Sequence, residues 1–132
     1  MKWLKIDGRE YNVSVLGISE TATIAYTVNT GQTVNGRTIL DPIGTSYGHA
    51  VTVGRKKGDV NELDKLYDYV TKPRFDAMRV DAVHGQDTIN YEAYISTPIT
   101  RVVKKIDDAN EIVYYDAFDI VFTPIEAQVK PI

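Results

Sequence analysis

One stretch of the chain decides the fold: residues 59–73, which read DVNELDKLYDYVTKP. Asp59 suits the N-cap of a helix, and Glu62 stands three residues further on, at the capping-box position. Pro73 prevents the helix from continuing. Between these ends, apolar residues recur at helical spacing and form one stripe: Val60, Leu63, Leu66, Tyr67 and Val70. Because a single helix must bury such a stripe against another element, we predict a helix at about 59–72 that packs on a sheet.

The segments on both sides of this helix alternate apolar and polar residues, which is typical of strands with one solvated face. Nine tyrosines also favour β structure. Asp7-Gly8, between two apolar runs, predicts a hairpin with a type I′ turn that joins residues 3–6 to residues 11–16. The other predicted strands are residues 20–28, 47–55, 75–83, 88–95, 99–106 and 111–123.

Together these elements predict a single domain over residues 1–123. Its fold class is α+β, mostly antiparallel β: a β-sandwich or partial barrel with one flanking helix. Residues 29–45 contain successive turn formers without a sustained period, which predicts an unusually long loop. Residues 124–132 contain two prolines and are predicted to form a C-terminal tail that lies on the surface or is loose.

The composition is that of an ordinary globular protein and excludes several functional classes. Of the 132 residues, 43% are hydrophobic and 25% charged, and the formal net charge is −3. This charge argues against a nucleic-acid-binding protein. The absence of cysteine excludes disulfides, thiol nucleophiles and thiolate metal sites. The first residues lack the apolar run of a signal peptide, and no segment reaches the length of a membrane span, so we expect neither secretion by the usual route nor a membrane association.

The clearest catalytic motif is Gly44-Thr45-Ser46-Tyr47-Gly48, which matches the G-x-S-x-G pattern of hydrolases. Asp76, Asp81 and His84 follow in the hydrolase chain order. A nucleophile elbow needs a strand before the serine and a helix after it, whereas here a predicted loop precedes Ser46 and a strand follows. We therefore expect no enzymatic activity.

Candidate metal and phosphate sites are weak as well. His49 and His84 are the only histidines, too few for a zinc site without carboxylate ligands. Residues 107–111 gather oxygen ligands suited to calcium but lack the EF-hand spacing, and a polar turn has the same composition. The basic run at residues 55–57 has no interleaved aromatic residues. We expect no metal, no cofactor and no specific binding of nucleic acid.

Five stretches, in order along nearly the whole chain, carry a family resemblance: IDGREYNV (6–13), DPIGTSY (41–47), ELDKLYDYVTKP (62–73), INYEAYIS (89–96) and FDIVFTP (118–124). In these stretches the chain resembles a family of small tail structural proteins of long-tailed phages and prophages of Gram-positive bacteria. The resemblance implies a tail-tube-like fold. It also implies subunits that assemble with copies of themselves into rings, often hexameric, and with neighbouring tail proteins. The expected location is the virion tail (tube, tube end or baseplate), after synthesis in the cytoplasm of the bacterial host.

A second reading of the same composition is a β-sandwich binding module for carbohydrate or protein. In that reading, exposed tyrosines act as stacking platforms. An aromatic strip that stands free of any subunit interface would favour this alternative.

Two segments are the predicted assembly arms: residues 29–45 and the hairpin at residues 99–114. Both are longer than a compact domain of this size needs, and long loops are tolerated because closure entropy grows slowly with length. The hairpin also carries more apolar side chains than an isolated, solvated ribbon should. The predicted interface residues are Asn29, Thr30, Val34, Ile39, Leu40, Val102, Val103, Ile106, Ile112 and Val113.

Overall fold

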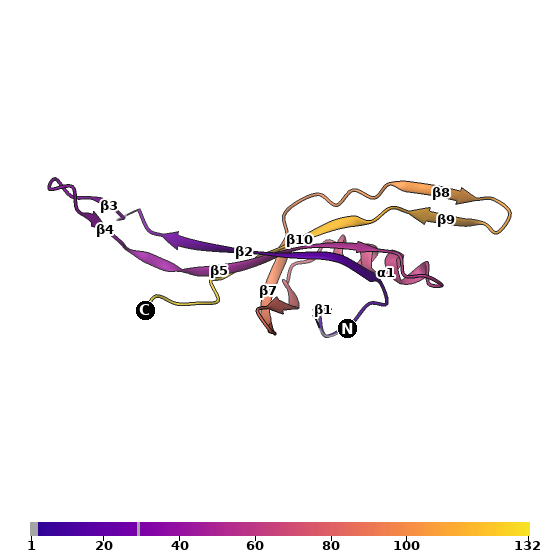
Figure 1. Cartoon of the computed structure of the whole chain (residues 1–132), viewed down its shortest axis with the longest axis horizontal. Helices are drawn as coiled ribbons and strands as arrows, with labels where there is room; N and C mark the ends of the chain where they lie inside the picture. The colour runs from indigo at the N-terminus through magenta and orange to yellow at the C-terminus, as the bar shows by residue number, and fades with distance from the viewer. Residues whose placement is uncertain (1–2, 29) are drawn as a thin grey trace.

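The computed structural model describes residues 3–28 and 30–132. In these residues six antiparallel strands form one sheet, in the order β1-β6-β7-β10-β5-β2, and two short hairpins, β3–β4 and β8–β9, extend beyond it (Figure 1). One helix accompanies them within the described ranges, so the predicted α+β, mostly antiparallel β class is confirmed. The elements are β1 (Leu4–Ile6), β2 (Ser14–Tyr26), β3 (Gly31–Gln32), β4 (Thr38–Ile39), β5 (Pro42–Gly54), α1 (Asn61–Val70), β6 (Met78–His84), β7 (Asp87–Ile95), β8 (Val103–Asp107), β9 (Ile112–Tyr115) and β10 (Phe118–Pro124).

The core lies between α1 and the sheet. Leu63, Leu66 and Val70 are buried, as the stripe predicted, and they join a cluster from β1, β5, β6, β7 and β10. The Asp59 carboxylate accepts hydrogen bonds from the N–H groups of Asn61 and Glu62, both at 3.2 Å, so it caps the helix as predicted. Glu62 does not complete the capping box; its carboxylate instead pairs with Arg9 at 3.0 Å.

The sheet curls so that its β2 edge meets the end of β6. The Glu20 carboxylate of β2 lies 2.8 Å from His84 Nδ1 and 3.1 Å from His49 Nε2. His49 is buried, and its Nδ1 lies 2.6 Å from the Tyr91 hydroxyl. These contacts join β2, β5, β6 and β7 around one polar centre.

No helix in the described part of the chain is long and apolar enough to cross a membrane.

The predicted N-terminal hairpin forms only at its turn. Asp7 and Gly8 have φ values of 50° and 80°, which the predicted type I′ turn requires, and Ile6 pairs with Arg9 across it. The pairing ends there, and β1 runs beside β6 instead, with Leu4 opposite Ala82. The reason is long-range: the Asp7 carboxylate accepts a hydrogen bond from the Arg79 backbone N–H at 2.8 Å, which fixes the turn against β6.

Several predicted strand limits are also corrected. The strands predicted at 11–16 and 20–28 are one strand, β2, with a register shift between Val15 and Gly17. The strand predicted at 75–83 begins only at Met78. The strand predicted at 111–123 divides into β9 and β10 around Asp116. The tail lies on the surface, one of the two predicted alternatives, where Val129 forms a β-bridge with Thr45.

Candidate assembly interface

Two arms extend from the sheet at opposite ends of the molecule's long axis (Figure 1). The first arm is the free part of the β2–β5 ribbon with the β3–β4 hairpin at its end, residues 21–48. The second arm is the β8–β9 hairpin with its preceding residue, 102–115. They coincide in large part with the two segments expected from the sequence, although the first was predicted as an irregular loop.

The first arm leaves the sheet because β10 stops pairing with β5 at His49. Beyond that residue β5 keeps β2 as its partner in a register that runs to Pro42 opposite Tyr26. Thr30 then fixes the base of the β3–β4 hairpin, because its hydroxyl accepts a hydrogen bond from the Asp41 N–H at 2.9 Å. Much of the predicted loop is therefore a hydrogen-bonded ribbon, held by pairs within the arm and by contacts of the C-terminal segment with Thr45 and Tyr47.

The predicted interface residues of the first arm are largely exposed. Val34, at the tip, is fully exposed, Leu40 is 64% exposed, and Ile39 is about half exposed. Thr30 is half-buried, and Asn29 lies outside the described residues. Sequence reasoning missed four further exposed apolar residues of the ribbon: Ile24, Tyr26, Val28 and Ile43. They alternate like a normal strand, and the pattern does not indicate that the sheet stops short of them.

The second arm has the same character. Val103 pairs with Tyr115 and Ile106 with Val113. Val102 and Ile106 are more than half exposed, Val103 and Val113 somewhat less, and Ile112 is half-buried. At its turn the Asp107 carboxylate accepts hydrogen bonds from the side chain and backbone of Asn110, which lower its pKa. This carboxylate therefore stabilises the turn, which agrees with the interpretation of residues 107–111 as a polar turn rather than as a calcium site.

Arg101 anchors the second arm to the helix. Its guanidinium lies 4.1 Å from the ring centre of Tyr67 and 3.8 Å from that of Tyr115, and it donates to the Asp64 carboxylate at 2.6 Å. No local pattern in the sequence marks this residue, because its partners come from two distant segments. The contact joins the start of the arm, its end and α1, so the hairpin projects in a defined direction.

The outer edge of β2 is a third exposed feature. Within residues 3–28 and 30–132, no strand pairs with that edge. The strand has thirteen residues with one charged side chain, Glu20, and no proline. Long edges without these protective residues are favourable sites for strand pairing with another chain.

The geometry of the hydrolase motif differs from that of a nucleophile elbow. Ser46 lies within the extended strand β5 and not at a turn between a strand and a helix. Both histidines contact Glu20. His49 Nε2 lies within hydrogen-bond distance of the Glu20 carboxylate and the Val83 carbonyl, and Nδ1 lies 2.6 Å from the Tyr91 hydroxyl. Burial, with the nearby Glu20 carboxylate, raises the pKa of Tyr91 well above its ordinary value. The cluster is thus satisfied internally.

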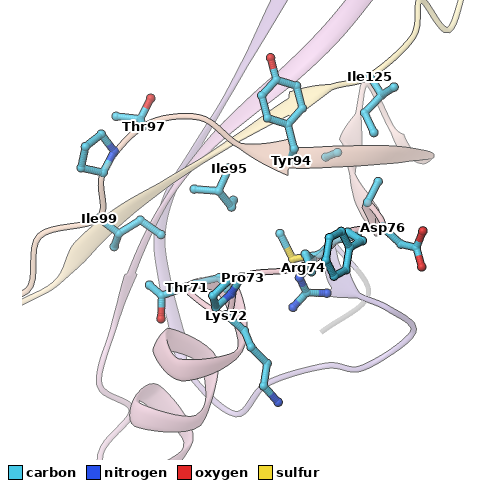
Figure 2. Close-up of a pocket in the computed structure, with 16 residues that line it drawn as sticks. Thr71, Lys72, Pro73, Arg74, Asp76, Tyr94, Ile95, Thr97, Ile99 and Ile125 are labelled. Carbon is cyan, nitrogen blue, oxygen red and sulfur yellow. The ribbon is translucent and has the colours of Figure 1, made fainter.

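A groove of about 430 Å³ lies where α1 ends against β7. Figure 2 shows Thr71 and Pro73 on one side of the groove, with Tyr94, Ile95 and Ile125 on the other. Phe75, which also lines it, is fully exposed. The described residues contain no group of three or more His, Cys, Asp or Glu side chains suited to a metal ion.

Comparison with known proteins identified no matching family model, no similar curated protein and no similar solved structure.

Proposed function

We propose that this protein is a non-enzymatic structural subunit that assembles with copies of itself into rings, as part of the tail of a phage or prophage. One observation carries the proposal: two ordered arms point away from the core in opposite directions and expose apolar side chains. Isolated exposed apolar residues are ordinary, but runs of them along projecting ribbons are typical of surfaces that become buried in an assembly.

The shape of the arms favours contacts between unlike surfaces. One arm continues β2 and β5 past the point where the pairing with β10 ends. The other arm, β8–β9, comes before β10 in the chain and connects to its first residue, at the end of β10 far from the first arm. Such head-to-tail contacts generate closed rings or open filaments. The sequence resemblance supplies the identity of the assembly: a tail tube, a tube end or a baseplate. In a tail, a net charge of −3 agrees with a conduit that does not retain DNA.

The experiment is light scattering coupled to size exclusion, followed by negative-stain microscopy, over a range of protein concentrations. We expect rings or short tubes for the wild type. Val34→Ser and Ile106→Ser, one in each arm, should weaken assembly while circular dichroism remains unchanged. Lys57→Ser, at an exposed position outside both arms, is the matched control. Assembly that is equally strong in both arm variants would contradict the proposed interface.

The alternative, a carbohydrate- or protein-binding module, is favoured by one observation: Phe75 and Tyr94 are both exposed at the apolar groove. Aromatic faces beside a groove are suitable for stacking on sugar rings. Titration of soluble glycans, monitored by tyrosine fluorescence, tests it. Saturable binding that Tyr94→Ala abolishes, in a protein that stays monomeric, would favour the module.

A further inference from the structure

Part of one edge of β5 lies beyond the end of its pairing with β10. β10 pairs with β5 only as far as His49, so the backbone groups of Thr45 and Tyr47 on that side have no partner from β10. The C-terminal segment of the chain occupies this position instead. The Thr45 N–H donates to the Val129 carbonyl at 2.9 Å, and the Thr45 carbonyl accepts from the N–H groups of Gln128 and Val129.

Gln128 extends this pairing with its side chain. The Tyr47 N–H donates to Gln128 Oε1 at 2.9 Å, and Gln128 Nε2 donates to the Tyr47 carbonyl at 3.0 Å. The amide thus pairs with one residue of β5 as a neighbouring strand would. The backbone N–H and C=O groups of two successive outward-facing residues of β5 are therefore hydrogen-bonded. The tail backbone pairs with Thr45, and the Gln128 side chain pairs with Tyr47.

Gly44 makes the close approach of the tail possible. A Cβ at this position would lie 2.5 Å from the Val129 carbonyl oxygen and 2.8 Å from the Ala127 Cβ. Its φ of 154° is also one that side-chain-bearing residues rarely adopt. The strand is therefore shaped to receive a peptide at this point.

The tail is held mainly by polar contacts. Val129 is 42% exposed, Ile125 is half exposed and Ile132 is fully exposed. All buried hydrophobic residues of the described core lie between Leu4 and Phe122. Because the tail contributes little apolar burial, it can detach without opening the core.

From these contacts we infer that residues 44–47 of β5 form a strand-accepting site, and that in the assembly its occupant is the C-terminal segment of a second copy. The chain's own residues 127–129 are a sequence that fits the site, and every copy carries that sequence. Exchange replaces each contact by an identical one, so it adds a link between neighbours without loss of bonding. The second part of this inference rests on the proposed function.

The site itself is tested with a fluorescent peptide of residues 124–132, PIEAQVKPI, added to full-length protein. The attached tail competes at high effective concentration, so the wild type should bind the peptide weakly. Gln128→Ala in the chain should weaken the attached tail and increase peptide affinity about tenfold or more. A peptide with the same Gln128→Ala change is the control. Adding Gly44→Val to the chain should abolish binding, with circular dichroism as the check on folding. Equal binding with and without Gly44→Val would overturn the site.

Exchange between copies is tested with cysteines, because the chain has none of its own. Thr45→Cys and Val129→Cys are prepared in separate proteins, mixed and oxidised. We expect a disulfide-linked dimer on a non-reducing gel, absent when Lys57→Cys, outside both arms, replaces Thr45→Cys. If assembled particles, verified by light scattering, yield no such dimer, exchange is overturned while the ring proposal stands. If no assembly forms, the ring proposal fails and the peptide assay still decides the site.

Discussion

β5 passes from a buried region to an exposed one along a single strand. Val51 and Val53, in its second half, are fully buried, whereas Ile43, in its first half, is 52% exposed. Both halves pair with β2 through the same antiparallel ladder. The difference lies in what surrounds them: α1 packs in the core with Val51 and Val53, and β10 pairs beside them in the sheet, whereas the pairing with β10 ends at His49 and does not continue along the arm. A strand pattern alone therefore does not determine burial; a second layer does.

The largest expected effect compares the core under the buried half of β5 with the first arm, through one identical change. Leu66→Ala, beneath the sheet, should lower the free energy of unfolding by about 2–5 kcal/mol, because it leaves a cavity in the core. Leu40→Ala, on the first arm, should lower it by less than about 0.5 kcal/mol. Urea denaturation measures both. A loss below about 0.5 kcal/mol for Leu66→Ala would place the helix outside the core.

The next effect concerns the junction between core and arm. Arg101→Lys keeps the charge but loses the planar group that lies between two tyrosine rings. We expect a loss of roughly 1–2 kcal/mol in thermal denaturation, together with faster hydrogen exchange over residues 102–115. Arg79→Lys, whose side chain is 56% exposed, is the control and should change stability little. Unchanged exchange in the arm would show that Arg101 does not determine its direction.

A smaller effect compares two carboxylates by pH. For Asp7, burial raises the pKa, but hydrogen bonds from Tyr69 and the Arg79 N–H and the charge of Arg74 outweigh it, so the pKa lies below 3.8. A lowered folded pKa means that this carboxylate stabilises the protein above the unfolded value and that the stabilisation disappears as pH falls through the folded value. Asp7→Asn, which tolerates the positive φ, should therefore destabilise at pH 7 and have less effect at pH 2.5.

Asp107→Asn is the matched variant on the arm. The pKa of Asp107 is lowered too, but mainly by hydrogen bonds from Asn110 within the same turn, whereas Asp7 has partners from three other positions, Tyr69, Arg74 and Arg79. Chemical denaturation at the two pH values should show a weaker pH dependence than for Asp7→Asn. The opposite order would mean that the turn of the second arm, and not the N-terminal turn, contributes more to folding.

The smallest expected effect on stability is that of the arm tips. Val34→Ser and Ile106→Ser remove exposed apolar groups, so each should change the free energy of unfolding by no more than about 0.5 kcal/mol. Hydrogen exchange should show both arms to be better protected in assembled than in isolated protein. Equal protection in the two states would identify the arms as internal structure.

Prediction from the sequence succeeded where the cause was local. The helix follows from spacing and a capping aspartate, and the Asp7-Gly8 turn from the positive φ that it needs. The two projecting ribbons coincide in large part with segments singled out for their length, and their role in assembly stays a prediction. The pairing of β1 with β6 could not be recognised, because it depends on contacts of Asp7 with residues about seventy positions away. The Arg101 anchor and the docked tail have the same kind of cause.

The sequence by itself determined the fold class, the helix and its buried stripe, because apolar periodicity reports which face of an element avoids water. Only the tertiary structure decided which strands share an edge, where the sheet stops, and which apolar faces remain uncovered. Those properties depend on side chains that meet across long separations, and alternation within a strand is identical whether or not a second layer lies above it. The exposed ribbon, the anchored hairpin and the peptide-filled edge of β5 all arise from that second kind of information.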